Sequence, residues 1–234
     1  FQVERIGFGQ PVQNDGRVVI FLLGLCLQVA GGEAERVIAG AIRWDAWHGE
    51  QGTPGQAMQH SLGPEKWHYR LPFFAKISKD GVTIDGTSQE IMDREIEYAH
   101  AAGLDYWAFV TYAENDAMSV GLKRYLSSSK RSRIQFCLIT ECERWRNESF
   151  VKRVGALLRE PGYQTVCGNR PLLYLGFINE QNVQQHWHGA AGLKKVLDGV
   201  RADAKQSGLG DPYVVIMDFN AVQGKRWLDA LGAD

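Results

Sequence analysis

The chain has 234 residues, of which 44% are hydrophobic and 23% charged, so it carries enough apolar material for a core and the charged fraction of an ordinary globular domain. Its formal net charge of -1 excludes a large field of one sign, so neither a nucleic acid nor an anionic membrane surface is predicted as a partner. Seven Trp, eight Tyr and ten Phe are many for this length; such rings either fill a core or stack on neutral sugars.

The first part of the chain has the pattern of a targeting segment. Phe1 is not a start residue, so residues 1–16 are not expected to represent the natural start of the protein. Arg17 then leads into an apolar run, and small residues follow, which indicates a secretory signal peptide over about 17–34. The run is shorter than the roughly 20 residues needed to span a bilayer, so no stable membrane insertion is expected. We therefore predict a secreted or periplasmic protein, with a buried element or a membrane anchor as the alternatives.

Residues 35–234 read as a single α/β unit. Short apolar runs alternate with helical patterns, which is typical of β/α units around a parallel sheet. The runs are continuous rather than alternating, as expected of strands that are covered on both faces. The predicted strands cover 37–42, 106–110, 134–139, 172–177 and 213–217.

The helix before the second of these strands has the clearest pattern. Thr87 and Glu90 have the spacing of a capping box at its start, and Gly103 can take the left-handed conformation at its end. Its apolar face is predicted to contain Met92, Ile96, Ala99 and Ala102. Further helices are predicted over about 117–128, 148–159, 190–207 and 223–231.

The number of predicted strands points to part of a barrel. Residues 232–234 resemble the turn at 103–105 that precedes the second strand, so a sixth strand is expected to follow. A (β/α)₈ barrel needs about 250 residues or more, whereas here about 200 residues hold five strands. We therefore predict a (β/α)₈ TIM barrel truncated after about five β/α units, with residues 45–86 forming an elaborate loop over its top.

Acidic and aromatic residues gather after the predicted strands, where a barrel carries its reacting groups. Glu141 and Glu143 are the predicted catalytic pair, because residues i and i+2 of an extended segment share a face and two carboxyl groups suit glycoside chemistry. The alternative is an ion pair with Arg144 or Arg146. The predicted substrate-binding residues are Trp44, Asp45, Trp47, His48, Tyr112, Trp145, Asp218 and Asn220. Packing of the aromatic rings, and helix capping by the aspartates, are the alternative roles.

No cofactor and no metal ion are predicted. No G-x-G-x-x-G, G-x-x-x-x-G-K-[ST] or G-x-S-x-G sequence follows a strand. His186 and His188 lack an H-E-x-x-H context and are interpreted as solvated or capping residues. Cys137, Cys142 and Cys167 have no C-x-x-C spacing, and Cys137 is predicted to lie in the core.

The chain contains three characteristic segments in fixed order, 103–112, 136–145 and 163–174. As an ordered set they resemble glycoside hydrolase family 99 and the related WbsX-like domains, over roughly residues 38–234. The resemblance implies a (β/α)₈ barrel that acts on glycans, with endo-α-mannosidase activity as the best-characterised activity of the family. It also implies that the carboxylates doing the chemistry lie near the last strands of the barrel, whereas Glu141 and Glu143 match acidic residues that contact the sugar. The flanking Cys142 and Arg144 depart from the family, so the sugar need not be mannose.

The sequence thus predicts a secreted glycoside hydrolase acting on a glycan or polysaccharide through a carboxylate pair, with the isolated fragment expected to be inactive. A non-catalytic carbohydrate-binding barrel is one alternative. A glycosyltransferase-associated protein of polysaccharide assembly is another. The sequence gives no prediction of oligomeric state.

Overall fold

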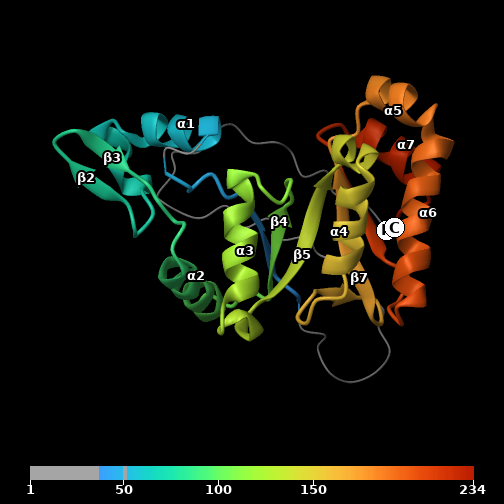
Figure 1. The fold of residues 1–234 in the computed structure, drawn as a ribbon, viewed down its shortest axis with the longest axis horizontal. Coiled ribbons are helices and arrows are strands. Elements are labelled where there is room, and N and C mark those ends of the chain that lie inside the picture. Colours follow the sequence, from blue (N-terminus) through green and yellow to red (C-terminus); the bar gives the residue numbers. More distant parts are fainter. Residues whose placement is uncertain (1–36, 50–51) are drawn as a thin grey trace, which may run out of the picture.

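The computed structural model describes residues 37–49 and 52–234 and shows a mixed α/β fold with a mostly parallel central sheet (Figure 1). The predicted signal segment, about 17–34, lies outside the described residues. The parallel strands, in their order across the sheet, are β1 (Gly40–Arg43), β4 (Tyr106–Val110), β5 (Gln135–Glu141), β7 (Arg170–Gly176) and β8 (Tyr213–Met217). The short β6 (Thr165–Val166) runs antiparallel to β7.

The order of the strands across the sheet is the same as their order along the chain. Each connection between parallel strands therefore leads to the next strand on the same side, from β1 toward β8. Because such crossovers are right-handed, the connecting helices lie on one face of the sheet. Figure 1 shows α3 beside β4 and α4 in front of β7. The helices are α2 (Gln89–Ala101), α3 (Val120–Ser127), α4 (Glu148–Leu157), α5 (Glu180–Trp187), α6 (Ala190–Gln206) and α7 (Ala221–Leu231).

The stretch 45–86, predicted to be a loop, contains structure of its own. Helix α1 (Gly52–Leu62) and the 3₁₀ helix η1 (Glu65–Arg70) lead into a hairpin of β2 (Lys76–Ser78) and β3 (Gly81–Thr83). The Gly and Pro residues in α1 lower its intrinsic helix propensity, which is why the sequence did not indicate a helix. Figure 1 shows this group of elements at one end of the sheet, beside α2.

The predicted helix before β4 is confirmed, but its predicted cap is wrong by one residue. Ser88 caps α2 through its Oγ, which accepts from the amide of Ile91 at 3.2 Å. Thr87 instead belongs to the turn before the helix, where its hydroxyl donates to Asp85 at 2.6 Å and its amide donates to the same carboxylate oxygen at 2.9 Å. Gly103 has φ +80°, as predicted for the helix end. Of the predicted apolar face, Met92, Ile96 and Ala99 are buried and Ala102 is exposed.

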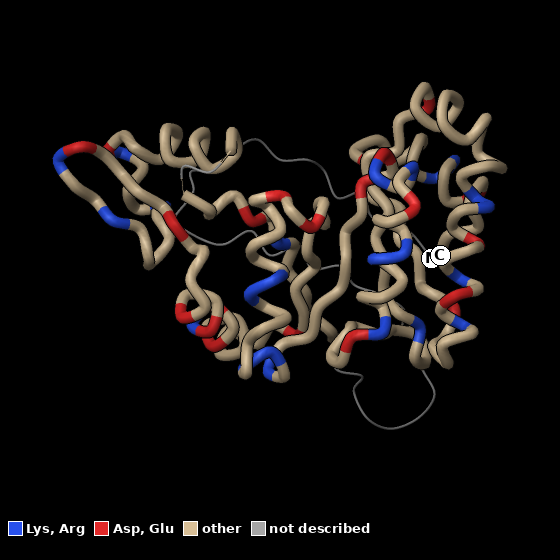
Figure 2. Tube along the Cα trace, in the orientation of Figure 1, with Lys and Arg blue, Asp and Glu red and all other residues tan. Residues whose placement is uncertain are grey.

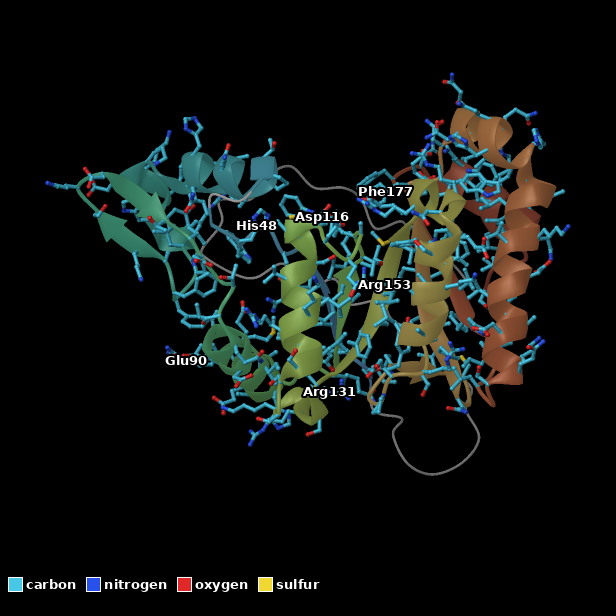
Figure 3. All side chains as sticks on the ribbon, in the orientation of Figure 1. His48, Glu90, Asp116, Arg131, Arg153 and Phe177 are labelled. Carbon is cyan, nitrogen blue, oxygen red and sulfur yellow. The ribbon has the colours of Figure 1, made fainter. Side chains whose placement is uncertain are left out.

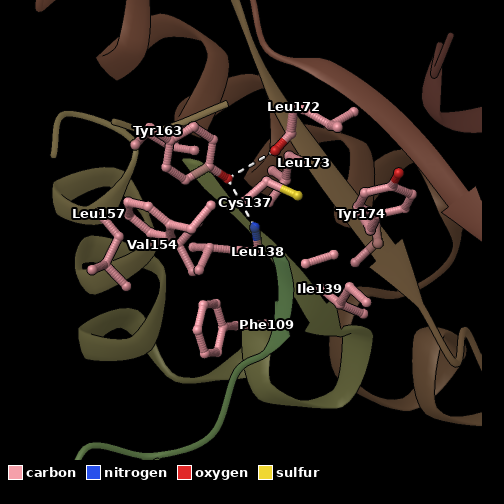
Figure 4. Packing of buried hydrophobic residues seen from close by; sticks show 14 of the residues in the cluster. Phe109, Cys137, Leu138, Ile139, Val154, Leu157, Tyr163, Leu172, Leu173 and Tyr174 are labelled. Atoms are coloured by element: carbon pink, nitrogen blue, oxygen red, sulfur yellow. Dashed lines mark hydrogen bonds between the residues drawn. The ribbon is translucent and has the colours of Figure 1, made fainter. Parts of the chain in front are cut away.

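A chain of aromatic rings holds the helices to the sheet. Tyr125 of α3 contacts Phe109 and Phe136, with ring centroids 5.3 and 5.2 Å apart, and Phe136 contacts Tyr163 at 5.0 Å. The Tyr163 hydroxyl donates to the carbonyl of Leu172 at 2.8 Å and accepts from the amide of Leu138 at 3.2 Å, as Figure 4 shows. It thereby ties β5 to β7 inside the core.

Tyr163→Phe is expected to lower the free energy of unfolding by about 1–3 kcal/mol. The variant removes the hydroxyl that bonds the buried carbonyl of Leu172 and the buried amide of Leu138. Urea denaturation followed by tryptophan fluorescence measures the change. Tyr98→Phe, at an exposed tyrosine of α2, is the control and should leave the midpoint nearly unchanged. Equal midpoints for the wild type and Tyr163→Phe would contradict the bridging role.

The other face of the sheet carries a polar contact between strands that are not neighbours. The hydroxyls of Tyr106 on β4 and Tyr174 on β7 lie 3.1 Å apart, and β5 runs between these two strands. Tyr106 points away from the helices, because its neighbour Trp107 packs on Tyr125 of α3. Side chains of this face thus converge above β5.

Candidate functional site

The residues that follow the parallel strands lie along one edge of the sheet, which we call the carboxyl rim. It comprises residues 44–48, 111–116, 142–146, 177–180 and 218–220, after β1, β4, β5, β7 and β8 respectively. In Figure 3, His48, Asp116 and Phe177 lie along this edge, whereas Arg131 lies toward the opposite one. Acidic and basic positions are spread over both halves of the described chain, as Figure 2 shows. Groups of both signs meet at the rim after β5, where Glu141 and Glu143 pair with Arg144 and Arg146.

Glu141 and Glu143 line the same cleft, which has a volume of about 620 Å³. The predicted reason for their proximity is wrong, because β5 ends at Glu141 and residues Cys142–Arg146 form the 3₁₀ helix η4. A 3₁₀ helix has three residues per turn, so it aligns each side chain with the third one along. Glu141 accordingly pairs with Arg144 at 2.8 Å and Glu143 with Arg146 at 3.1 Å.

Glu143 has an additional neighbour and one unused oxygen. Its Oε1 lies 3.6 Å from Nε2 of His186, which α5 carries to the rim. Its Oε2 is buried and has no hydrogen-bond partner among the described residues. A buried carboxylate oxygen without a donor is costly, whereas the Glu143 side chain as a whole is 39% exposed and lines the cleft.

An aromatic wall adjoins this cleft. The indole of Trp44, 48% exposed, donates to the hydroxyl of Tyr112 at 2.7 Å, and the guanidinium of Arg144 lies 4.6 Å from the centre of the Tyr112 ring. Burial raises the pKa of Tyr112, so its phenol keeps its proton and can donate it to a bound hydroxyl. Arg153 fixes the same loop by donating to the carbonyl of Tyr112 at 2.7 Å.

Asp45, in the first segment of the rim, belongs to a buried ion cluster. Arg43 donates to Asp45 and to Glu95 of α2, each at 2.7 Å, and all three side chains are largely buried. Burial raises the pKa of Asp45 and of Glu95 more than the charge of Arg43 lowers them. A Cβ at Gly121 would overlap the Asp45 carboxylate, so α3 approaches closely only because this position is glycine. The placement argues for a structural role of Asp45 rather than the predicted substrate contact.

His48 and Trp145 are also turned into the protein. His48 is 2% exposed, and its Nε2 lies 3.2 Å from Sδ of Met118. Trp145 is 2% exposed, so its ring packs in the core and is not presented to a sugar as predicted. Trp47 is half-buried, and its carbonyl accepts from the amide of Gly86 at 2.7 Å.

The two predicted residues after β8 shape the backbone. Asp218 is exposed, and its carboxylate accepts from the amide of Asn220 at 2.8 Å. The side chain of Asn220 accepts from the amides of Val222 and Gln223 and caps α7. Helix capping, the alternative for aspartates, is thus the role that Asn220 performs here.

The structure brings together Glu141, Glu143, Tyr112 and Trp44, and it adds His186 as a residue whose role sequence reasoning missed.

Among the described residues, no three His, Cys, Asp or Glu side chains are grouped so that they could hold a metal ion. Within 37–49 and 52–234, no helix has the length and apolar character needed to cross a membrane. Cys137 and Cys142 are buried, as predicted for Cys137, and Cys167 is exposed.

No protein-family model matches the chain, and no curated protein matches its sequence. The functional assignment therefore depends on the geometry of the carboxyl rim.

Proposed function

We propose that the described sheet is the first part of a (β/α)₈ barrel. The singly wound strand order supports this, because doubly wound sheets reverse direction at a switch point. The contact of Tyr106 with Tyr174 across β5 supports it as well, since inward-facing side chains of a barrel converge in this way. In the described part of the chain β1 and β8 each pair with one parallel strand, which leaves a place for strands that close the barrel.

We further propose that the protein is a secreted or periplasmic glycoside hydrolase similar to family 99 and the WbsX-like domains. The observation that carries the proposal is that Glu141 and Glu143 share one cleft beside the exposed Trp44 and Tyr112. Carboxylates accept hydrogen bonds from the hydroxyl groups of a sugar, while aromatic rings stack on its apolar face. A second carboxyl group would protonate the leaving oxygen, as in the general scheme of glycoside hydrolysis.

The two glutamates, the side chains that pair with them and the adjoining aromatic residues have roles in this scheme. The carboxylate of Glu143 is the acceptor for a sugar hydroxyl or an attacking water, and His186 and Arg146 hold its Oε1 in place. Glu141, paired with Arg144, accepts from a neighbouring hydroxyl. The phenolic hydroxyl of Tyr112 donates a hydrogen bond to a hydroxyl of the bound sugar. The indole ring of Trp44 provides the face on which the sugar stacks.

A second candidate is a non-catalytic carbohydrate-binding barrel. The observation that favours it is that both glutamates are paired with arginines, which suits acceptance of hydrogen bonds better than donation of a proton. The two candidates share the same ligand class and differ in whether a glycosidic bond is broken.

Incubation of the full-length protein with α-mannans and a panel of other polysaccharides, followed by a reducing-end assay, is expected to show new reducing ends. Binding without turnover on every glycan would instead establish the second candidate. Activity that requires a sugar nucleotide would point to polysaccharide assembly and overturn the hydrolase. An inactive Glu141→Gln/Glu143→Gln double variant serves as the control for contaminating hydrolases.

A further inference from the structure

We infer that Phe177 and Phe219 form a second sugar-binding subsite on the carboxyl rim, distinct from the Glu141/Glu143 cleft; this inference depends on the proposed function. Phe177 follows β7 and is 50% exposed, and Phe219 follows β8 and is 97% exposed. Their ring centroids lie 6.2 Å apart with an angle of 57° between the planes. The two rings border a cleft of about 430 Å³.

Both rings are held in positions that are unfavourable without a ligand. Large apolar rings gain free energy when they leave water, and within the described part of the chain these two remain in it. Phe177 also has φ +55°, in the left-handed region that residues with a Cβ rarely adopt. Backbone strain of this kind concentrates at ligand-binding sites, where the surrounding structure maintains it.

The surrounding contacts fix the two loops that carry the rings. Nε2 of Gln223 donates to the carbonyl of Ile178 at 3.2 Å, which joins α7 to the loop after β7. Asn179 caps α5 and Asn220 caps α7, so each loop passes directly into an anchored helix. The platform is therefore formed before a ligand arrives, which reduces the entropy lost on binding.

The polar groups beside the rings select the chemistry of the ligand. The exposed carboxylate of Asp218 and the side chains of Gln181 and Glu180 line the same cleft. Arg226 pairs with Glu180 at 2.8 Å, and carboxylates outnumber cations around the cleft. Hydroxyl groups donate to such acceptors, whereas an anionic ligand would be repelled. A neutral pyranose, with an apolar face and a rim of hydroxyls, matches both features.

The register of the sheet relates this subsite to the glutamates. Gly176 of β7 pairs with Glu141 of β5, and Phe177 is the next residue along the chain. Neighbouring strands lie about 4.8 Å apart, which is comparable with the length of one sugar unit. Consecutive units of one oligosaccharide can therefore reach the glutamate cleft and the phenylalanine platform together.

Phe219→Ala is expected to weaken the binding of a linear tetrasaccharide to the full-length protein by roughly five- to tenfold. Titration calorimetry with tetrasaccharides of α-mannose, α-glucose, β-glucose and β-xylose measures the dissociation constants. Phe219→Trp keeps a stacking face and should restore the affinity. Val222→Ala, at an 82% exposed apolar residue in the first turn of α7, three residues after Phe219, is the matched control and should leave the affinity unchanged.

The outcomes for the subsite and for the hydrolase are separable. Weaker binding by Phe219→Ala, in a protein that hydrolyses none of the tetrasaccharides, would support the subsite and count against the hydrolase. Hydrolysis with equal affinity in Phe219→Ala and wild type would overturn the subsite and retain the hydrolase. Unchanged affinity together with a lower unfolding temperature would assign the ring to packing and also overturn the subsite.

Discussion

Glu143→Gln lowers kcat/KM for glycan hydrolysis by about 100-fold or more if the proposed function is correct, the range lost when a positioned acid or base is removed. The amide keeps the size of the side chain, but it cannot take up a proton, and its nitrogen is a donor where the sugar requires an acceptor. The initial rate of reducing-end release from the best glycan of the panel measures the effect. Because the proposed role of Glu143 is exercised in the transition state, most of the loss should appear in kcat.

Glu148→Gln is the matched control for this experiment. Glu148 begins α4, is highly exposed and pairs with Lys152, so its charge is removed only five residues from Glu143 without a change in the glutamate cleft. Wild-type kinetics are expected for it. A Glu143→Gln enzyme that retains its kcat and shows only a raised KM would show that Glu143 binds substrate and that the reacting carboxylates lie elsewhere.

Arg43→Met is expected to destabilise the fold by about 3–5 kcal/mol, the cost of removing one partner from a buried ion cluster. Methionine fills a similar volume, so the loss arises mainly from Asp45 and Glu95, which remain buried without their counter-charge. The contact of the guanidinium with the Trp107 ring, 4.5 Å from its centre, is lost as well. Since domains of this size are stable by only about 5–15 kcal/mol, urea denaturation should show a large shift of the midpoint.

Two further variants separate charge from packing. Lys152→Met removes a cation from an exposed ion pair and should leave the midpoint nearly unchanged. Arg43→Met/Asp45→Asn/Glu95→Gln removes the whole cluster and should recover much of the stability, because no uncompensated charge remains buried. If the triple variant is as unstable as Arg43→Met, packing rather than charge holds this region.

The pH dependence of the Arg43→Met defect has a definite sign. Burial raises the pKa of Asp45 above 3.8 and that of Glu95 above 4.5. The folded state then holds these protons more tightly than the unfolded state, so the associated stability is complete below the ordinary pKa values and is lost as the pH rises through the folded ones. Arg43 opposes this loss by lowering both pKa values. The difference between wild type and Arg43→Met should therefore be larger at pH 7 than at pH 4.

The strands of the sheet could be predicted well where burial is continuous. β4 and β8 begin and end at the predicted residues, since each is a short apolar run between turns. β1 begins at Gly40 rather than Val37, and Val37 is 66% exposed, because hydrophobicity alone does not determine which residues pair with a neighbouring strand. Helix α5 was missed because Val183 is the only residue it buries, which leaves no apolar stripe in the sequence.

The candidate site could be predicted in its residue types but not in its contacts. Glu141 and Glu143 were identified, yet the turn of η4 that pairs each with an arginine depends on the backbone after β5 and has no periodic signal. His186 comes from a different β/α unit than Glu143. Asp45 was predicted to contact substrate because Glu95, which completes the buried cluster by pairing with Arg43, is distant in sequence. Such contacts arise from topology, which residue spacing does not encode.

The strand order of the sheet also bears on how this protein could acquire a new specificity. Each group on the carboxyl rim comes from the connection that follows its own strand, so Trp44, Tyr112, Glu143 and Phe177 belong to separate, contiguous stretches of the chain. An insertion or exchange in one connection alters one wall of the rim and leaves the hydrogen bonds of the strands intact. Substrate preference and fold stability can thus diverge independently, and specificity can be changed by grafting a single loop.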